Sequence, residues 1–216
     1  VNCLPVLDIP FDGADPIISD RAFGVDPEMI SILGRVAGEA LLMEGILPVI
    51  KHIPGHGRAN VDSHKALPTV RTDWAELSKN DFSPFKLLAD MPIAMTAHII
   101  YSAIDPENPA TTSTKIILDI IREEIGFDGL LISDDLSMKA LDGDFSYRTQ
   151  AALAAGCDAV LHCNGDMSEM KEISDVVFDL SDKSADRLER ALVQIDGFKT
   201  LDRQVALERL AELGIN

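Results

Sequence analysis

The chain has 216 residues, of which 46% are hydrophobic, and a formal net charge of −17 at pH 7. This composition is typical of a soluble globular protein, and we expect residues 1–216 to form a single domain. The negative charge argues against nucleic acid or an anionic membrane as a partner, because both bind basic surfaces. No apolar run approaches the roughly 18–20 residues that a membrane-spanning helix needs.

The three cysteines, Cys3, Cys157 and Cys163, lie in or beside apolar runs, and none belongs to a C-x-x-C pair. Buried free thiols are expected at all three positions, which suits a reducing compartment. No signal-peptide pattern is present. These features predict a cytoplasmic protein. Because the chain opens at Val1, almost inside a strand, we expect further residues to precede it in the complete protein.

The first apolar run, residues 4–8, predicts a strand, and a loop rich in Asp, Gly and Pro follows it. Asp26 and Pro27 then begin a helix, as N-cap and first helical residue, and Gly45 ends it. The helical period predicts an inward-facing stripe that consists of Met29, Leu33, Val36, Ala37, Ala40 and Leu41.

Four more strands are predicted after this helix, with a helical pattern between most of them. The strands are predicted at residues 47–51, 92–97, 129–133 and 157–163. The helical segments are predicted at 73–88, with a break near Pro84, at 114–125 with Ser113 or Thr114 as cap, and at 148–155. From residue 168 onward the pattern predicts a tail of two or three amphipathic helices.

Apolar strands that alternate with helices indicate a parallel sheet covered on both faces, an α/β fold. Polar residues follow the strands, namely Asp8, Lys51, His52, His98, Asp134, Asp135, His162 and Asn164. This pattern favours a (β/α)8 TIM barrel with its site at the C-terminal mouth. An open doubly wound sheet usually has a Gly-rich turn after its first strand, which is absent here. About five strands cannot close an eight-stranded barrel, so we expect two or three N-terminal elements to lie outside this chain.

Residues 51–57 read Lys-His-Ile-Pro-Gly-His-Gly and follow directly from the second predicted strand. One proline and two glycines favour an irregular loop over a helix. Asp62 and His64 follow shortly after and are two residues apart, so in extended backbone their side chains point to the same side. A carboxylate beside an imidazole can fix the tautomer of the ring, as proton transfer near neutral pH requires.

Each of these residues has a structural interpretation beside the functional one. For the pair of Asp62 and His64 the functional interpretation is favoured. Lys51 can either bind a polar substrate or extend into solvent, and the sequence does not favour one over the other. His56 lies between two glycines and is expected to organise the loop by hydrogen bonding rather than to act in catalysis.

The remaining polar residues are weighed in the same way. Asp134 and Asp135 are adjacent on a strand and point to opposite sides, so one is expected to be functional and the other structural. Arg21, taken alone, is expected to be a solvated loop residue. His98 and His162 are isolated in the sequence and are expected to be structural.

A divalent metal held at the strand ends is a chemical alternative, because clustered His and Asp residues can bind one. Barrels of that kind typically carry an H-x-H pair at the end of an early strand. Here Lys51 occupies that position beside His52, and its positive charge would repel a metal ion. We therefore expect no metal.

The motif at residues 51–57, together with Asp-Ser-His at 62–64, resembles the signature of glycoside hydrolase family 3, specifically its β-N-acetylhexosaminidases of bacterial peptidoglycan recycling. Further blocks in the same order resemble this family from residue 1 to about residue 164. They are Leu-Pro-Val-Leu-Asp at 4–8, Asp-Arg-Ala-Phe-Gly at 20–24, Met-Thr-Ala-His at 95–98 and Ser-Asp-Asp-Leu-Ser-Met at 133–138.

The resemblance implies a retaining two-step hydrolysis of terminal N-acetylglucosamine (GlcNAc) from muropeptides that contain anhydromuramic acid. Asp134 matches the nucleophile, and His64 paired with Asp62 matches the acid/base of this subfamily. The sugar-binding residues of the family correspond to Arg21, Lys51 and His52. No metal or organic cofactor is implied, and the recycling enzymes it resembles imply a cytoplasmic location.

Two features depart from the family pattern. Ile53 replaces a commoner phenylalanine, which is an apolar exchange, and the acidic Gly-Gly-Arg motif that binds sugar in the family is not found in this chain. Two other functions therefore stay open. One is a GlcNAc phosphorylase of the same family, because a histidine acid/base leaves the site less anionic and could admit phosphate. The other is an inactive sugar-binding fragment.

Overall fold

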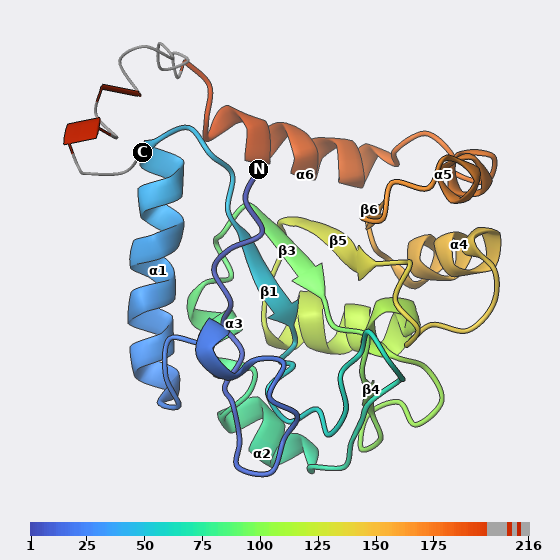
Figure 1. Ribbon diagram of the computed structural model, residues 1–216, viewed down its shortest axis with the longest axis horizontal. Helices are drawn as coiled ribbons and strands as arrows, with labels where there is room; N and C mark the ends of the chain where they lie inside the picture. Colours follow the sequence, from blue (N-terminus) through green and yellow to red (C-terminus); the bar gives the residue numbers. More distant parts are fainter. Residues whose placement is uncertain (198–206, 209–210, 213–216) are drawn as a thin grey trace.

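The computed structural model describes residues 1–197, 207–208 and 211–212, and its centre is a four-stranded parallel sheet (Figure 1). The strands lie side by side in the order β1 (Val49–Ile53), β3 (Ile93–Thr96), β5 (Leu130–Asp135) and β6 (Ala159–Leu161). The first predicted strand runs parallel to β1 but forms only two isolated bridges, from Asn2 to Pro48 and from Val6 to Lys51. It therefore occupies the position of a fifth strand without a continuous ladder.

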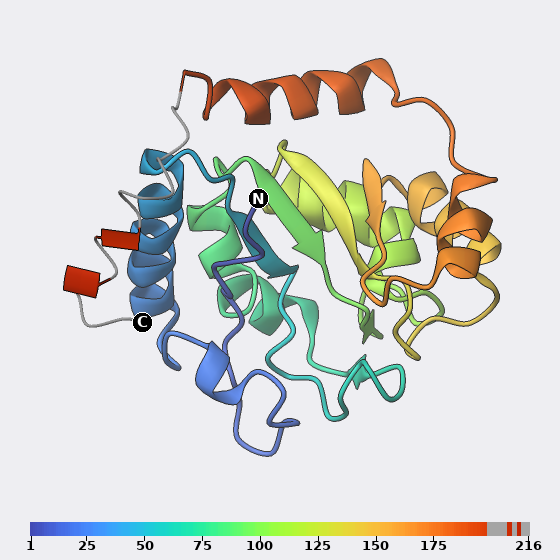
Figure 2. The same ribbon diagram turned by 45° about the horizontal axis from the view of Figure 1, so that its top comes forward.

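The spatial order of these strands is the same as their order in the sequence. A doubly wound sheet reverses direction at a switch point, whereas the wall of a (β/α) barrel does not. The helices of the crossovers lie mainly on one face: in Figure 2, α2, α3 and η3, drawn in green to yellow-green, lie behind the sheet. The described sheet has the arrangement of a barrel wall that is open at both edges.

Helix α1 (Pro27–Met43) begins as predicted, with the Asp26 carboxylate accepting a hydrogen bond from the N–H of Glu28. The predicted inward stripe is wrong, because Met29, Leu33 and Val36 are exposed by 47%, 37% and 59%. The buried face consists of Ile30, Ser31, Gly34 and Gly38.

The glycines of α1 explain this difference. A Cβ atom on Gly34 would lie 2.4 Å from the Leu7 side chain, and one on Gly38 would lie 3.0 Å from the sulfur of Met91. Because glycine has no side chain, the helix can approach Leu7 of the first strand at Gly34 and the Met91 side chain at Gly38. Close backbone packing, rather than apolar periodicity, selects the face of α1 that turns inward.

The predicted helix at 73–88 is two helices, α2 (Trp74–Lys79) and α3 (Ser83–Leu87), and Pro84 lies at the start of the second rather than at a kink. Ser113 caps the next helix as predicted, but residues 116–124 form a π-helix, η3 (Ile116–Glu124). Helix α4 (Phe145–Ala155) begins three residues earlier than predicted, directly after its N-cap Asp144.

Shorter elements are η1 (Ser19–Arg21), η2 (Ala110–Thr112) and a small parallel sheet of β2 (Thr69–Val70) with β4 (Ile100–Tyr101).

Two helices of the predicted tail are described, α5 (Met167–Ser174) and α6 (Asp182–Val193), while residues 198–206, 209–210 and 213–216 lie outside the described residues. Helix α6 runs along the edge where the strands begin (Figure 2). Its Arg187 and Ser184 bind Oδ1 of the buried Asp158, whose other oxygen accepts from Arg122 and from the N–H of Leu131. Asp158 thus joins α6, η3 and β5.

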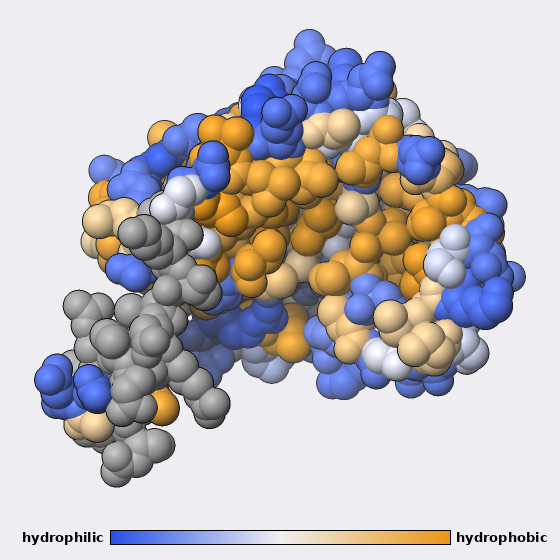
Figure 3. Space-filling view, turned by 90° about the horizontal axis from the view of Figure 1, so that it is seen from above, coloured by the Kyte–Doolittle hydropathy of each residue, from blue (hydrophilic) through white to orange (hydrophobic). Residues whose placement is uncertain are grey.

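Alternate residues of the strands separate two apolar clusters. The larger contains Leu7, Ile50, Ala94 and Leu131 and lies between the sheet and the crossover helices. The smaller lies on the other face and consists of Leu47, Val49, Ile93, Met95, Leu130 and Ala191 of α6. Seen from above, apolar side chains form a broad continuous surface (Figure 3).

In the part of the chain that the structure describes, no helix is long and apolar enough to cross a membrane.

All three cysteines are free, but only Cys157 is buried, so the prediction of buried thiols was wrong for Cys3 and Cys163. Cys163 lies two residues after the end of β6, whose three residues are themselves only partly buried. Burial raises the pKa of Cys157 to about 12, with the Asp158 charge acting in the same direction. Burial also raises the pKa of Cys163, together with the charges of Asp135 and Asp134.

Thiol labelling of the native protein at pH 7.5 is therefore expected to modify Cys3 and Cys163 and to spare Cys157, because only accessible thiolates react. Cys163 is expected to react more slowly than an unperturbed thiol, since its raised pKa lowers the thiolate fraction. Mass spectrometry after maleimide treatment gives the sites and rates. Labelling of Cys157 before unfolding would contradict its buried position.

Candidate active site

Asp8 is a fully buried carboxylate at the end of the first predicted strand. Its Oδ1 accepts hydrogen bonds from the backbone N–H groups of His52, at 3.1 Å, and of His56, at 2.6 Å. Its Oδ2 lies 2.6 Å from Nδ1 of His52. Burial raises the pKa of Asp8, but the His52 and His56 interactions outweigh this effect, so its pKa lies below the ordinary value.

An ionised carboxylate can only accept hydrogen bonds, so Nδ1 of His52 carries the proton that it shares with Asp8. Among the described residues, no hydrogen bond is formed by Nε2 of His52, which leaves this nitrogen for a ligand. The ladder between β1 and β3 skips His52, since Lys51 pairs with Met95 and Ile53 with Thr96. Such a bulge at the end of a strand redirects a side chain.

The glycines of the loop after β1 allow it to lie directly against the first strand. A Cβ atom on Gly57 would lie 1.7 Å from the carbonyl oxygen of Ile9. Gly55 has a φ of +143°, a conformation that favours glycine, and its carbonyl accepts a hydrogen bond of 2.6 Å from the Tyr101 hydroxyl. The proline and glycine pattern in the sequence thus reflects a close backbone contact that brings His56 over Asp8.

Asp62 and His64 interact, but residues 63–65 form a turn and not the extended backbone on which the prediction rested. Oδ1 of Asp62 accepts from the backbone N–H of His64 at 2.9 Å and lies 2.8 Å from Nδ1 of its ring. Burial raises the pKa of Asp62, but these two hydrogen bonds and the His64 charge lower it more, so the net shift is downward. Asp62 is buried, whereas the His64 side chain is 60% exposed, so the ring is oriented from one side and open on the other.

Asp134 lies near the end of β5, within electrostatic reach of the imidazoles of His52 and His98 and of the Lys51 ammonium. Burial raises the pKa of this carboxyl, but the imidazoles of His52 and His98 lower it more. The backbone N–H of Asp135, at 2.8 Å, and the Lys51 ammonium act in the same direction, so the pKa of Asp134 lies below its ordinary value. At neutral pH Asp134 is a carboxylate.

Asp135 has a different environment from its neighbour. Its carboxylate accepts hydrogen bonds from the N–H and hydroxyl of Ser137 and from the N–H of Cys163. These bonds join the loop after β5 to the end of β6. Asp135 is therefore engaged with its own loops, while Asp134 faces the residues at the end of β1.

The remaining histidines are bound to neighbouring residues. His98 is buried and contacts the Thr111 hydroxyl at 2.7 Å through Nδ1, and its Nε2 lies 3.1 Å from the carbonyl oxygen of Asp135. Burial lowers the pKa of His98, which the charge of Asp134 partly offsets. His162 lies 2.7 Å from Glu169. Both ring nitrogens of His98 therefore have protein partners, whereas Nδ1 of His162 is buried without one among the described residues.

The structure brings Lys51, His52 and Asp134 within electrostatic reach of one another. Arg21 is on η1, is exposed, and donates to the carbonyl of Ile17 at 3.1 Å. No hydrogen bond or ion pair between described residues joins Arg21 to the other candidates. Within the same described residues, no group of three or more His, Cys, Asp or Glu side chains is arranged to hold a metal ion.

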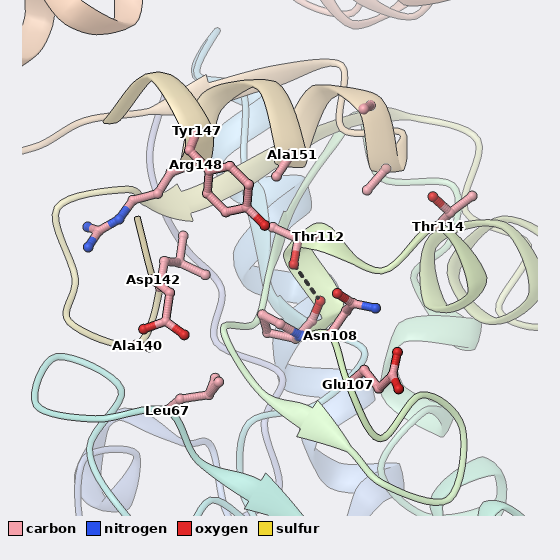
Figure 4. Close-up of a pocket in the computed structure, with 14 residues that line it drawn as sticks. Leu67, Glu107, Asn108, Thr112, Thr114, Ala140, Asp142, Tyr147, Arg148 and Ala151 are labelled. Atoms are coloured by element: carbon pink, nitrogen blue, oxygen red, sulfur yellow. Dashed lines mark hydrogen bonds between the residues drawn. The ribbon is translucent and has the colours of Figure 1, made fainter. Parts of the chain in front are cut away.

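A cavity of about 300 Å³ lies between the loop of residues 107–112 and α4 (Figure 4). Asn108, Asp142 and Tyr147 are among its lining residues, and none of the predicted site residues contributes to it. Arg148 at its edge donates to the carbonyls of Leu136 and Met138 and so supports the loop after β5. The cavity is separate from the strand-end site.

Sequence reasoning missed Asp8 as a member of this site and treated it only as a polar strand end. The signal for it was present, because an acidic residue directly follows the apolar residues 4–7. Its partners His52 and His56 lie 44 and 48 residues away, and a contact of that separation depends on the pairing of two parallel strands.

Comparison with known proteins places these residues in a family. The chain matches the family described as glycosyl hydrolase family 3 N terminal domain over residues 2–196. A beta-hexosaminidase of Bordetella avium is 40% identical over 164 residues, which are 74% of this chain and 46% of that protein. One of Nitrosomonas eutropha is 37% identical over 193 residues, or 88% of this chain and 55% of that protein. The chain thus spans about half the length of the curated relatives it matches.

Solved structures agree with this match. A family 3 β-N-acetylglucosaminidase from Paenibacillus sp. str. FPU-7 has a TM-score of 0.84 at 29% identity, over 93% of this chain and 41% of that one. NagZ from Neisseria gonorrhoeae, solved in complex with N-trifluoroacetyl-D-glucosamine, has a TM-score of 0.77 at 30% identity, over 98% of this chain and 63% of that one. With the strand order, these likenesses confirm the predicted TIM-barrel type of fold, incomplete in this chain. Because the family match covers residues 2–196 of 216, the chain belongs to glycosyl hydrolase family 3.

Proposed function

We propose that the protein containing this chain is an exo-acting, retaining β-N-acetylglucosaminidase. The observation that carries the proposal is the presence of two groups with different environments, an ionised carboxylate and a hydrogen-bonded Asp–His pair. One carboxylate, Asp134, is kept ionised at a strand end opposite His52 and Lys51. A second unit, the hydrogen-bonded Asp62 and His64, presents an accessible imidazole. Family membership and relatives named beta-hexosaminidase support this reading of the two units.

The first step of the proposed mechanism forms a covalent intermediate. The Asp134 carboxylate attacks the anomeric carbon of a terminal GlcNAc, and the bond from that carbon to the leaving oxygen breaks. Protonated His64 gives its Nε2 proton to the leaving oxygen, so that an alcohol departs. Asp62 keeps the ring oriented through Nδ1 and stabilises its charged form.

The second step releases the sugar. Neutral His64 takes a proton from water, the water oxygen attacks the anomeric carbon, and the ester bond to Asp134 breaks. Two inversions at the same carbon give net retention of configuration. In this proposal Lys51 and the exposed Arg21 on η1 donate hydrogen bonds to the sugar, and Nε2 of His52 forms a hydrogen bond with a sugar hydroxyl.

The proposed substrate class is GlcNAc linked to anhydromuramic acid in muropeptides, and the proposed location is the cytoplasm, where peptidoglycan fragments are recycled. Two observations support the sugar. The curated relatives are beta-hexosaminidases, and the NagZ of Neisseria gonorrhoeae was solved with a GlcNAc analogue. The net charge of −17 disfavours nucleic acid as an alternative partner.

The test is hydrolysis of 4-nitrophenyl GlcNAc β-glycoside by the full-length protein, followed by NMR of the anomer formed first. We expect β-GlcNAc as the initial product, with the same rate in the presence and absence of inorganic phosphate. GlcNAc-1-phosphate as product would assign a phosphorylase instead. Binding of GlcNAc without turnover would assign a sugar-binding protein and would end the hydrolase proposal.

A further inference from the structure

We propose that His56 is a positioning residue, which holds the acid–base loop, residues 62–64, in place through a hydrogen bond to Ser63. The proposal rests on the proposed function, because the loop carries His64. The key observation is the distance of 3.0 Å between Nε2 of His56 and Oγ of Ser63, both of which are buried. His56 therefore links Asp8, at the end of the first strand, to the loop that carries His64.

The His56 end of this link is anchored to the sheet. Its backbone N–H donates to Asp8 at 2.6 Å, and its ring lies 5.3 Å from the ring of His52, centroid to centroid. Gly57, the next residue, presses against the backbone of Ile9. The backbone of His56 therefore cannot move away without separating this loop from the first strand.

The Ser63 end lies at the centre of the acid–base loop. Among the described residues, all other hydrogen bonds of residues 62–64 stay within residues 62–66. The bond to His56 is thus the one polar connection between this loop and the rest of the described chain. It fixes the loop at the residue between Asp62 and His64, while the His64 ring stays 60% exposed.

The connection is independent of charge near neutral pH. Burial lowers the pKa of His56 to about 4, and the nearby His52 acts in the same direction, against the attraction of Asp8 and Asp134. His56 is therefore neutral while the enzyme works, and a neutral imidazole forms the bond to the Ser63 hydroxyl. His64 is left as the ring that moves protons, in agreement with the loop-organising role expected for His56.

The role predicts a selective kinetic defect in Ser63→Ala, which removes one oxygen and leaves Asp62 and His64 unchanged. Without the bond the loop samples more positions, and protonation of the leaving oxygen becomes less frequent. We expect kcat/KM, which reports the first step, to fall on the order of tenfold for a GlcNAc glycoside with a sugar or alkyl leaving group. For a 2,4-dinitrophenyl leaving group, which needs no proton, kcat/KM should stay within about twofold of the wild type.

A matched control is Ser184→Ala, which also removes a buried hydroxyl. Ser184 is on α6, and its hydroxyl donates to the buried Asp158. This variant is expected to keep the wild-type dependence on the leaving group. An equal loss in Ser63→Ala for both leaving groups, or no loss for either, overturns the proposal. A His64→Ala variant serves as reference for complete loss of the acid.

Hydrogen exchange gives a readout that does not need activity. Peptides covering residues 59–66 are expected to exchange faster in Ser63→Ala than in the wild type, with no change in Ser184→Ala. Unchanged exchange in Ser63→Ala overturns the link between His56 and the loop. If the wild type does not hydrolyse GlcNAc glycosides, the proposed function fails while the exchange result still decides whether the link exists.

Discussion

Replacement of Asp134 by Asn is expected to lower kcat for hydrolysis of a GlcNAc β-glycoside by about 10⁴-fold, or about 5 kcal/mol in the barrier. The amide has almost the same shape as the carboxylate but is not a nucleophile. Because the pKa of Asp134 lies below its ordinary value, the exchange also removes a negative charge from the site. Steady-state kinetics with 4-nitrophenyl GlcNAc measure the loss, and circular dichroism checks the fold.

Asp135→Asn is the matched control, one residue further along β5. Asn retains an oxygen that can accept from the N–H groups of Ser137 and Cys163, as Asp135 does now. We expect less than about a tenfold loss in kcat, because Asp135 acts on loop position rather than on the sugar. If Asp134→Asn kept activity comparable to that of Asp135→Asn, the covalent mechanism would be wrong.

The strands could be predicted from the sequence because parallel strands with both faces covered are apolar throughout. The predicted runs at 47–51, 92–97, 129–133 and 157–163 each overlap a strand of the sheet. The face of α1 could not be predicted in this way. Its apolar residues Met29 and Val36 point outward because Gly34 lets the backbone approach Leu7, and close approach leaves no apolar signal in the sequence.

Local contacts at the candidate site were also predictable, whereas distant ones were not. The contact between Asp62 and His64 was expected because they are two residues apart, although the bond forms in a turn and not on extended backbone. The bonds from Asp8 to His52 and from His56 to Ser63 depend on how a strand and two loops meet in space. The short pair of β2 and β4 was missed for a similar reason, because two residues per strand carry no periodic pattern.

Asp8→Asn is expected to lower the free energy of unfolding by about 2–3 kcal/mol at pH 7, which is the contribution of a buried hydrogen bond to a charged group. The Asn oxygen can still accept from the N–H groups of His52 and His56. Its NH₂ group, however, meets the proton on Nδ1 of His52, where the carboxylate accepts at 2.6 Å. Urea denaturation of both proteins measures the difference. Asp119→Asn, an exposed exchange on η3, is expected to change stability by less than about 0.5 kcal/mol.

The pH dependence of this difference in unfolding free energy tests whether Asp8 stabilises the fold through its charge rather than through its shape alone. The folded-state pKa of Asp8 lies below the ordinary value of 3.8, which approximates that of the unfolded chain. A depressed carboxyl pKa contributes stability that is fully present above 3.8 and is lost as pH falls through the folded-state value. The difference in unfolding free energy between the wild type and Asp8→Asn should thus be constant from pH 7 to pH 5 and shrink below pH 4. A difference that grew on acidification would mean that Asp8 is protonated in the folded protein, and that His52 is oriented by something other than a buried charge.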